Sequence, residues 1–230
     1  MHEEPCPDLV YVAARGSGQN GWLTEPFAQG LGDRGRRVLG FLREALGRDS
    51  ESLPAIAVDY PATAVGYNAA AWTPELGNYP AVYAASAELG AVRARNAVMR
   101  TALACADSQF VLFGYSQGGQ VIGDAFAGLA SPVRARVARV ILFAEATYAA
   151  GDPQVDFRPA AVPGAGIKGR RAFFPASPGT VIESWCWVKD AVCQRPPGGT
   201  QFHGDIYDDY ERAAAASAAT AIRARVGTGA

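Results

Sequence analysis

The pentapeptide Gly-Tyr-Ser-Gln-Gly at residues 114–118 has the residue types and the spacing for covalent catalysis. It follows the apolar run 110–113, which predicts a buried strand. Gly-x-Ser-x-Gly between a strand and a helix is typical of a nucleophile elbow, a sharp turn that lifts a serine above the sheet. The two glycines leave room where a Cβ would clash in such a turn. We predict Ser116 as the nucleophile; a glycine-rich turn with an ordinary serine is the alternative.

A serine hydroxyl needs a base to take its proton, and histidine suits this task near neutral pH. The chain has two histidines, His2 and His203. His2 precedes the first expected strand, so it would lie at the sheet edge opposite the elbow. His203 lies between the last expected strand and the last expected helix, at the same edge as the elbow. We therefore predict His203 as the base; the alternative is a solvated loop histidine.

An acid is needed to orient the imidazole, and the chain order Ser, acid, His accompanies this type of elbow. The carboxylates between the two residues are Asp124, Glu145, Asp152, Asp156, Glu183 and Asp190. Asp190 follows the last expected strand and lies between two cysteines, whose bonding would hold the carboxylate in place. We predict Asp190 as the acid. Glu145, just after the fourth expected strand, is the second candidate.

The negative oxygen that forms when a nucleophile attacks a carbonyl group needs hydrogen-bond donors that are already in place. The backbone N–H of Gln117, the residue after the nucleophile, supplies one donor. Ser17, in the loop after the first expected strand, can supply a backbone N–H and a hydroxyl. We expect these two residues to form an oxyanion hole.

Alternating strands and helices must position these residues. The expected strands are 8–14, 53–58, 110–113, 137–143 and 180–186. Helical spacing connects Phe27, Leu31, Val38, Leu42 and Leu46, and further helices are expected at about 81–104, 117–129 and 206–225. This order predicts an α/β fold with a central five-stranded parallel sheet and helices on both faces.

The helix at 81–104 is expected from one stripe of side chains at helical spacing, namely Leu89, Val92, Asn96, Met99 and Leu103. Two connecting segments could build up the walls of the site. Residues 61–80 are expected to be an elaborated loop and residues 148–180 a long irregular connection near the site. An apolar groove could be lined by aromatic residues, of which half or more should be core: Trp22, Trp72, Tyr115, Phe173, Phe174 and Phe202.

Composition limits the class of protein. The 230 residues, of which 49% are hydrophobic, are expected to form a single domain, 1–230, and a monomer. A net charge of −1 indicates no nucleic-acid or anionic membrane surface as partner. No apolar run is long enough to span a bilayer, and no signal-like segment precedes Cys6. The spacing of the four cysteines and two histidines is not that of a metal site. Two disulfides in an oxidising compartment are the preferred interpretation, with four free thiols as the alternative.

Taken together, these motifs resemble the cutinase family of serine esterases, which includes acetylxylan esterases and actinobacterial lipid esterases. The resemblance covers nearly the whole chain and rests on Cys6-Pro7-Asp8-Leu9-Val10, Ala14-Arg15-Gly16-Ser17, residues 114–118, Cys186-x-x-x-Asp190-x-x-Cys193 and His203. It implies a three-layer α/β-hydrolase fold. It also implies the triad Ser116, Asp190 and His203, the oxyanion hole Ser17 and Gln117, and the pairs Cys6–Cys105 and Cys186–Cys193.

We therefore expect a secreted serine esterase without metal or cofactor that hydrolyses cutin-like polyester, acylglycerol or other lipid esters. Acetylxylan or cell-envelope mycolyl esters are alternative substrates for the same fold. A dinucleotide-binding oxidoreductase is a remote alternative, because Gly16, Gly18 and Gly21 match Gly-x-Gly-x-x-Gly. That fingerprint expects an acidic residue about 20 positions later, whereas Asp59 lies much further along the chain. A non-catalytic binding protein is a second remote alternative, disfavoured by the complete set of Ser, Asp and His.

Overall fold

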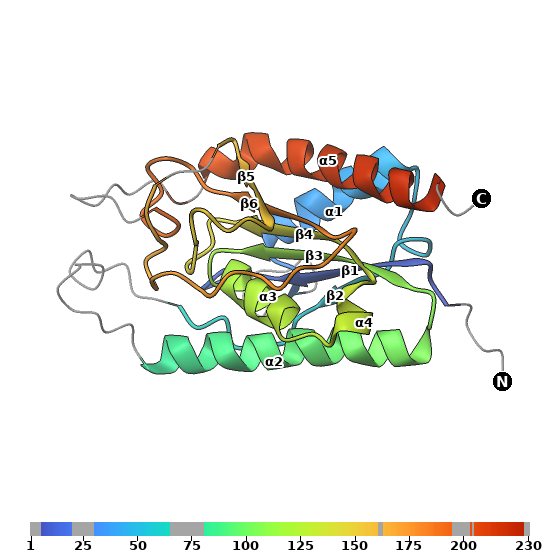
Figure 1. Cartoon of the computed structure of the whole chain (residues 1–230), viewed down its shortest axis with the longest axis horizontal. Helices are drawn as coiled ribbons and strands as arrows, with labels where there is room; N and C mark the ends of the chain where they lie inside the picture. Colours follow the sequence, from blue (N-terminus) through green and yellow to red (C-terminus); the bar gives the residue numbers. More distant parts are fainter. Residues whose placement is uncertain are drawn as a thin grey trace.

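A six-stranded sheet forms the centre of the computed structural model, which describes residues 6–19, 30–64, 81–160, 163–194, 203 and 205–227 (Figure 1). The strands are β1 (Leu9–Ala14), β2 (Ala55–Ala57), β3 (Gln109–Tyr115), β4 (Val137–Phe143), β5 (Val155–Arg158) and β6 (Val181–Trp185). They run parallel in the order β2-β1-β3-β4-β6-β5. Strands β1 and β4 are buried along their whole lengths, as expected for parallel strands covered on both faces.

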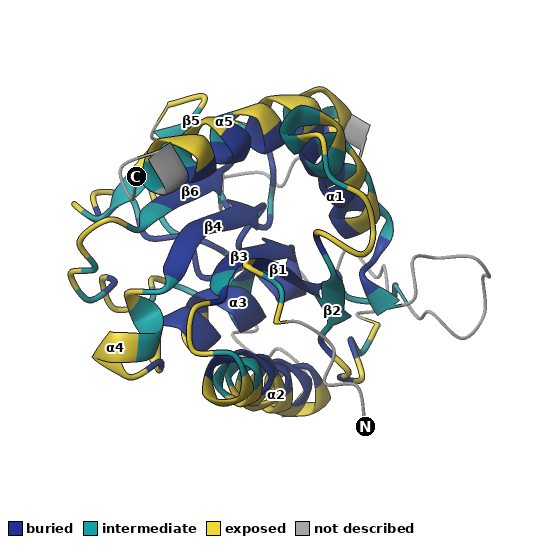
Figure 2. Cartoon of the chain, turned by 90° about the vertical axis from the view of Figure 1, so that its right-hand side faces the viewer, coloured by how far each residue is buried: buried dark blue, intermediate teal, exposed yellow. Residues whose placement is uncertain are grey.

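Helices cover both faces of this sheet (Figures 1 and 2). The helical elements are α1 (Asp33–Leu46), α2 (Ala81–Ala104), α3 (Gln117–Ala127), α4 (Ser131–Arg134), η4 (Asp205–Tyr207) and α5 (Asp208–Gly227). One apolar core joins α1 and α5 to one face, and a second core joins α2 and α3 to the other. The predicted three-layer α/β architecture is confirmed.

The prediction of five strands is wrong, because β5 forms within the range 148–180 that we expect to be irregular. Its four residues, Val-Asp-Phe-Arg, lie at the edge of the sheet and none of them is buried. A short edge strand of this kind has no continuous apolar run that would distinguish it from a loop.

Several element bounds also differ from the predictions, whereas those of α2 agree. Strand β2 has only three residues of the range 53–58, and α3 ends at Ala127. Helix α1 begins at Asp33, after Leu31, while Phe27 lies outside the described residues. The last helix, α5, begins at Asp208 and is preceded by the 3-10 turn η4.

Of the predicted side-chain stripe on α2, Met99 packs against the core, whereas the other four residues are exposed. Leu89 and Val92 are each 39% exposed and Leu103 is 82% exposed. The buried face consists mainly of small residues, including Ala87, Ala94 and Gly90. A Cβ on Gly90 would lie 2.8 Å from a methyl group of Val121 on α3. The close approach of these two helices therefore selects the small-residue face, and the larger side chains are left at the surface.

The predicted aromatic groove is only partly within the described residues. Trp22, Trp72 and Phe202 lie outside them, as do residues 65–80 of the expected loop. Phe174 belongs to the core and packs edge-on against Phe126, with 5.6 Å between ring centroids. Phe173 is exposed.

None of the described helices is both long and apolar enough to cross a membrane. The prediction that the whole chain forms one domain stays a prediction.

Candidate active site

Ser116 occupies a strained turn between β3 and α3. Its backbone has φ 58° and ψ −119°, a conformation that residues with a side chain rarely adopt. A Cβ at position 118 would overlap the carbonyl oxygen of Ala14, and one at position 114 would overlap that of Gly118. The Ser116 N–H donates to the carbonyl of Phe143 at 2.8 Å. The elbow is thus tied to the neighbouring strands, and its glycines are sterically required.

His203 connects Ser116 to Asp190. Its Nε2 lies 2.9 Å from Ser116 Oγ, and its Nδ1 lies 3.0 Å and 3.1 Å from the two carboxylate oxygens of Asp190. The imidazole stacks on the ring of Tyr115, with 5.1 Å between centroids and 12° between planes. The structure therefore brings together the three predicted triad residues, from three loops at the carboxyl edge of the sheet.

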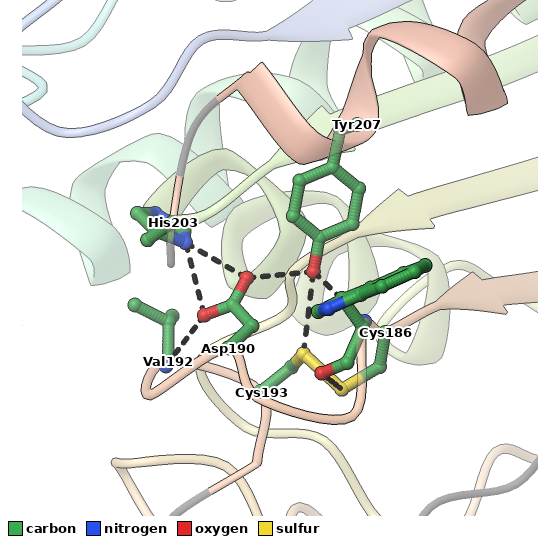
Figure 3. The surroundings of a disulfide bond; sticks show 7 residues. Cys186, Asp190, Val192, Cys193, His203 and Tyr207 are labelled. Carbon is green, nitrogen blue, oxygen red and sulfur yellow. Dashed lines mark hydrogen bonds and ion pairs between the residues drawn. A yellow bond between two sulfur atoms is a disulfide. The ribbon is translucent and has the colours of Figure 1, made fainter. Parts of the chain in front are cut away.

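Asp190 is completely buried in the loop between Cys186 and Cys193 (Figure 3). Its Oδ1 accepts the Val192 N–H at 2.7 Å, and its Oδ2 accepts the Tyr207 hydroxyl at 2.6 Å. Backbone and side-chain donors thus hold a charge that is shielded from water. Of the two disulfides, Cys186–Cys193 closes this loop, and Cys6–Cys105 joins the segment before β1 to the end of α2; both pairs agree with the pairing that the resemblance implies.

Glu145, the second candidate for the acid, has a different set of partners. It is also completely buried, but its Oε1 lies 2.9 Å from Arg171 Nε and accepts the Thr147 hydroxyl at 2.9 Å. Arg171 in turn pairs with Asp152 at 2.6 Å. Burial raises the pKa of Glu145, while Arg171 acts to lower it. The carboxylate that contacts the histidine is therefore Asp190.

The two predicted oxyanion-hole residues lie on segments that meet at the elbow. Gln117 is the first residue of α3, so its N–H is at the positive end of that helix. Ser17 follows β1, next to the carbonyl groups of residues 14 and 15, which pack against Gly118. The Ser17 hydroxyl donates to the Thr63 carbonyl at 2.6 Å. In this arrangement the Ser17 hydroxyl proton is directed at a backbone carbonyl. The backbone N–H is therefore the group of Ser17 that we assign to the predicted oxyanion hole.

The prediction from sequence missed the contacts of three residues around the triad. Tyr207 contacts Asp190, and Tyr115 stacks on His203. Arg34 lies 5.0 Å from the Tyr115 ring centroid and forms ion pairs with Asp208 and Glu211. The signal that could have pointed to two of them is closeness in sequence, because Tyr115 is inside the elbow motif and Tyr207 is four residues after His203. Nothing in the chain order identified their partners.

Among the described residues, no cluster of His, Cys, Asp or Glu could hold a metal ion.

The family model for cutinase matches residues 5–222 of the chain. Carboxylesterase Culp1 of Mycobacterium tuberculosis (strain ATCC 25618 / H37Rv) is 33% identical over 144 residues, which cover 63% of this chain and 54% of that protein. Cutinase CUT1 of Coprinopsis cinerea is 30% identical over 192 residues, which cover 84% of this chain and 73% of that protein. The chain thus spans about half the length of the Culp1 proteins that it matches.

Solved structures show the same fold. An acetylxylan esterase superposes with a TM-score of 0.67 at 23% identity, over 92% of this chain and 97% of that one. A cutinase-like protein from Cryptococcus sp. superposes with a TM-score of 0.65 at 17% identity, over 96% of each chain. These likenesses confirm the predicted α/β-hydrolase fold. The family match over nearly the whole sequence shows that this chain belongs to the cutinase family.

Proposed function

We propose that this protein is a serine esterase that cleaves carboxylic esters through an acyl-enzyme. The observation that carries the proposal is the unbroken line from Ser116 Oγ through the imidazole of His203 to the carboxylate of Asp190, with contacts of 2.9 Å and 3.0 Å. This is the geometry in which a histidine can take a serine proton while a carboxylate stabilises the imidazolium. The cutinase and carboxylesterase relatives support the same activity.

In the proposed mechanism, Ser116 attacks the ester carbonyl as His203 Nε2 removes its proton. Asp190 fixes the tautomer of the imidazole, because Nδ1 must carry its proton toward the carboxylate. The backbone N–H groups of Ser17 and Gln117 stabilise the oxyanion of the tetrahedral intermediate. His203 then protonates the leaving alcohol, and a water molecule, activated in the same way, releases the acid and restores the serine.

The decisive experiment is Ser116→Ala, assayed on p-nitrophenyl butyrate. We expect kcat to fall by at least about 10⁴-fold, with an unchanged melting temperature. Wild type should be labelled once by a p-nitrophenyl phosphonate, and Ser116→Ala should not be labelled. Ser131→Ala, at an exposed serine that begins α4, is the matched control and should behave as wild type. Full activity or labelling of Ser116→Ala would exclude the mechanism.

Initial rates on p-nitrophenyl esters from acetate to palmitate, with acetylxylan and a polyester in parallel, distinguish a lipid or polyester esterase from a carbohydrate esterase.

We also propose that the protein is a secreted monomer. Two disulfides support an extracellular location, because such bonds persist in oxidising compartments.

A further inference from the structure

Tyr207 places a phenol against the acid of the candidate triad. The residue ends η4 and is completely buried. Its hydroxyl lies 2.6 Å from Asp190 Oδ2 and accepts the backbone N–H of Trp187 at 3.1 Å (Figure 3). Burial, together with the negative charge of Asp190, raises the pKa of Tyr207 well above its ordinary value. The phenol therefore stays protonated and donates a hydrogen bond to the carboxylate.

The position of this hydroxyl is determined by its surroundings. The Tyr207 ring packs against Phe143, Tyr115 and Tyr210, with centroid distances of 5.7, 6.2 and 6.0 Å. Its oxygen also lies 3.5 Å from Cys193 Sγ, one end of the disulfide that closes the loop of Asp190. The ring that carries the donor and the loop that carries the acceptor are therefore each held by contacts of their own.

The carboxylate of Asp190 is consequently held at both oxygens. Oδ1 accepts from the Val192 N–H and Oδ2 from Tyr207, while both oxygens face His203 Nδ1. Rotation of the carboxylate would break at least one of these bonds. A donor also withdraws part of the negative charge that would otherwise stabilise the imidazolium.

We propose that Tyr207 is a positioning residue of the triad, which fixes the rotation of the Asp190 carboxylate and moderates its hold on protonated His203. This inference rests on the proposed function, in which Asp190 and His203 act together. Tyr207 acts through Asp190 and does not touch the reacting atoms.

The other charged and titratable groups nearby do not contact the carboxylate. Tyr115 lies against His203, and Arg34 lies 5.0 Å from the Tyr115 ring and 5.7 Å from the Tyr207 ring. The charge of Arg34 is balanced by Asp208 and Glu211. Among the described residues, the titratable side chains hydrogen-bonded to Asp190 are His203 and Tyr207. Removal of the Tyr207 hydroxyl therefore takes away one of these two titratable partners of Asp190, together with the acceptor of the Trp187 N–H.

The test is Tyr207→Phe, which removes the hydroxyl and keeps the ring. The matched control is Tyr11→Phe: Tyr11 is also completely buried, and its hydroxyl donates to a backbone carbonyl, that of Gly35, at 3.0 Å. We expect kcat/KM of Tyr207→Phe on p-nitrophenyl butyrate to fall about tenfold, mainly through kcat. The acidic limb of its pH profile should move to higher pH by about half a unit to one unit, because the imidazolium is held more strongly. Tyr11→Phe should leave both quantities unchanged.

A second readout does not depend on ester hydrolysis. The chain has only two histidines, so a His2→Gln background leaves His203 as the single imidazole in a proton NMR titration. The titration midpoint of His203 should rise in Tyr207→Phe and stay constant in Tyr11→Phe. An unchanged midpoint in Tyr207→Phe would overturn the inference, even if activity were lost. If wild type neither hydrolyses esters nor reacts with the phosphonate, the proposed function fails, while the NMR titration still tests the contact.

A third variant tests the proposal independently in case Tyr207→Phe folds poorly. Incorporation of 3-fluorotyrosine at position 207 keeps the ring and the hydroxyl but makes the phenol a stronger donor. The His203 midpoint should then move in the opposite direction, to lower pH. A shift of the same sign as in Tyr207→Phe, or no shift, would contradict the proposed role.

Discussion

Asp190 and Glu145 are two completely buried carboxylates that follow neighbouring strands, β6 and β4, at the same edge of the sheet. The chain order Ser, acid, His permits either of them as the acid. Their partners differ in kind. Glu145 is paired with the guanidinium of Arg171, whereas Asp190 is hydrogen-bonded to His203, Tyr207 and one backbone N–H.

This difference separates a structural carboxylate from one that is suited to catalysis. Arg171 is a permanent cation, so it faces Glu145 with a positive charge at every pH at which that carboxyl is ionised. Asp190 faces an imidazole that gains and loses a proton, so its charge is compensated fully only when His203 is protonated. Burial alone therefore does not identify a catalytic carboxylate; the nature of the group that compensates its charge does.

The largest expected effect comes from neutralising the acid. Asp190→Asn should lower kcat on p-nitrophenyl butyrate by about 10⁴-fold, because an amide stabilises neither the imidazolium nor the required tautomer. Glu145→Gln is the matched variant, and it should keep kcat within a few fold of wild type. If Glu145→Gln were the inactive variant and Asp190→Asn the active one, the assignment of the two carboxylates would be reversed.

The next effect concerns stability. Arg171→Met leaves the charges of Glu145 and Asp152 buried without their cation, and it should lower the free energy of unfolding by about 3–5 kcal/mol at pH 7. Urea unfolding monitored by tryptophan fluorescence measures this loss. The double variant Glu145→Gln/Arg171→Met should be more stable than Arg171→Met alone, since one of the uncompensated charges is gone. Equal stability of the two variants would mean that the ion pair of Glu145 with Arg171 contributes little to the free energy of unfolding.

The loss in free energy of unfolding that Arg171→Met causes should depend on pH in a defined direction. Burial already raises the pKa of Glu145, and loss of Arg171 removes an interaction that lowers it. A carboxyl with a raised pKa in the folded state opposes folding once it ionises, so the deficit of Arg171→Met relative to wild type should be largest at neutral pH. It should shrink as the pH falls toward about 4, the ordinary range of a glutamate. A deficit that grew at low pH would contradict this account of Glu145.

The smallest effect concerns the loop that holds Asp190. Removal of its disulfide by Cys186→Ser/Cys193→Ser should cost about 2–3 kcal/mol of stability in the chain-entropy model, because the sequence separation is only 7. It should also lower kcat, because the carboxylate is less well held. The control is Cys6→Ser/Cys105→Ser, which opens a loop with a sequence separation of 99. That variant should lose more stability yet keep kcat, since Cys6 precedes β1 and lies at the opposite edge of the sheet. Equal losses of kcat in the two variants would remove the link between the Cys186–Cys193 loop and Asp190.

Local features of the sequence were sufficient to predict most elements and the candidate triad. A buried parallel strand such as β4 needs a continuous apolar run, and the elbow needs glycines at 114 and 118 because backbone atoms lie where a Cβ would be. These requirements act within a few residues, so they are visible in the chain itself. The two histidines reduced the choice of base to His203.

The tertiary structure alone decided how distant segments pair. The exposure of Leu89 follows from the close packing of the adjacent Gly90 on α3, which no periodicity in α2 reveals. In the same way β5 forms because an edge of β6 is available to it. The different partners of Asp190 and Glu145, and the contact of Tyr207 with the acid, depend on residues that meet only after folding. Hydrogen bonds and ion pairs act over a few ångströms in space, and separation along the chain does not specify that distance.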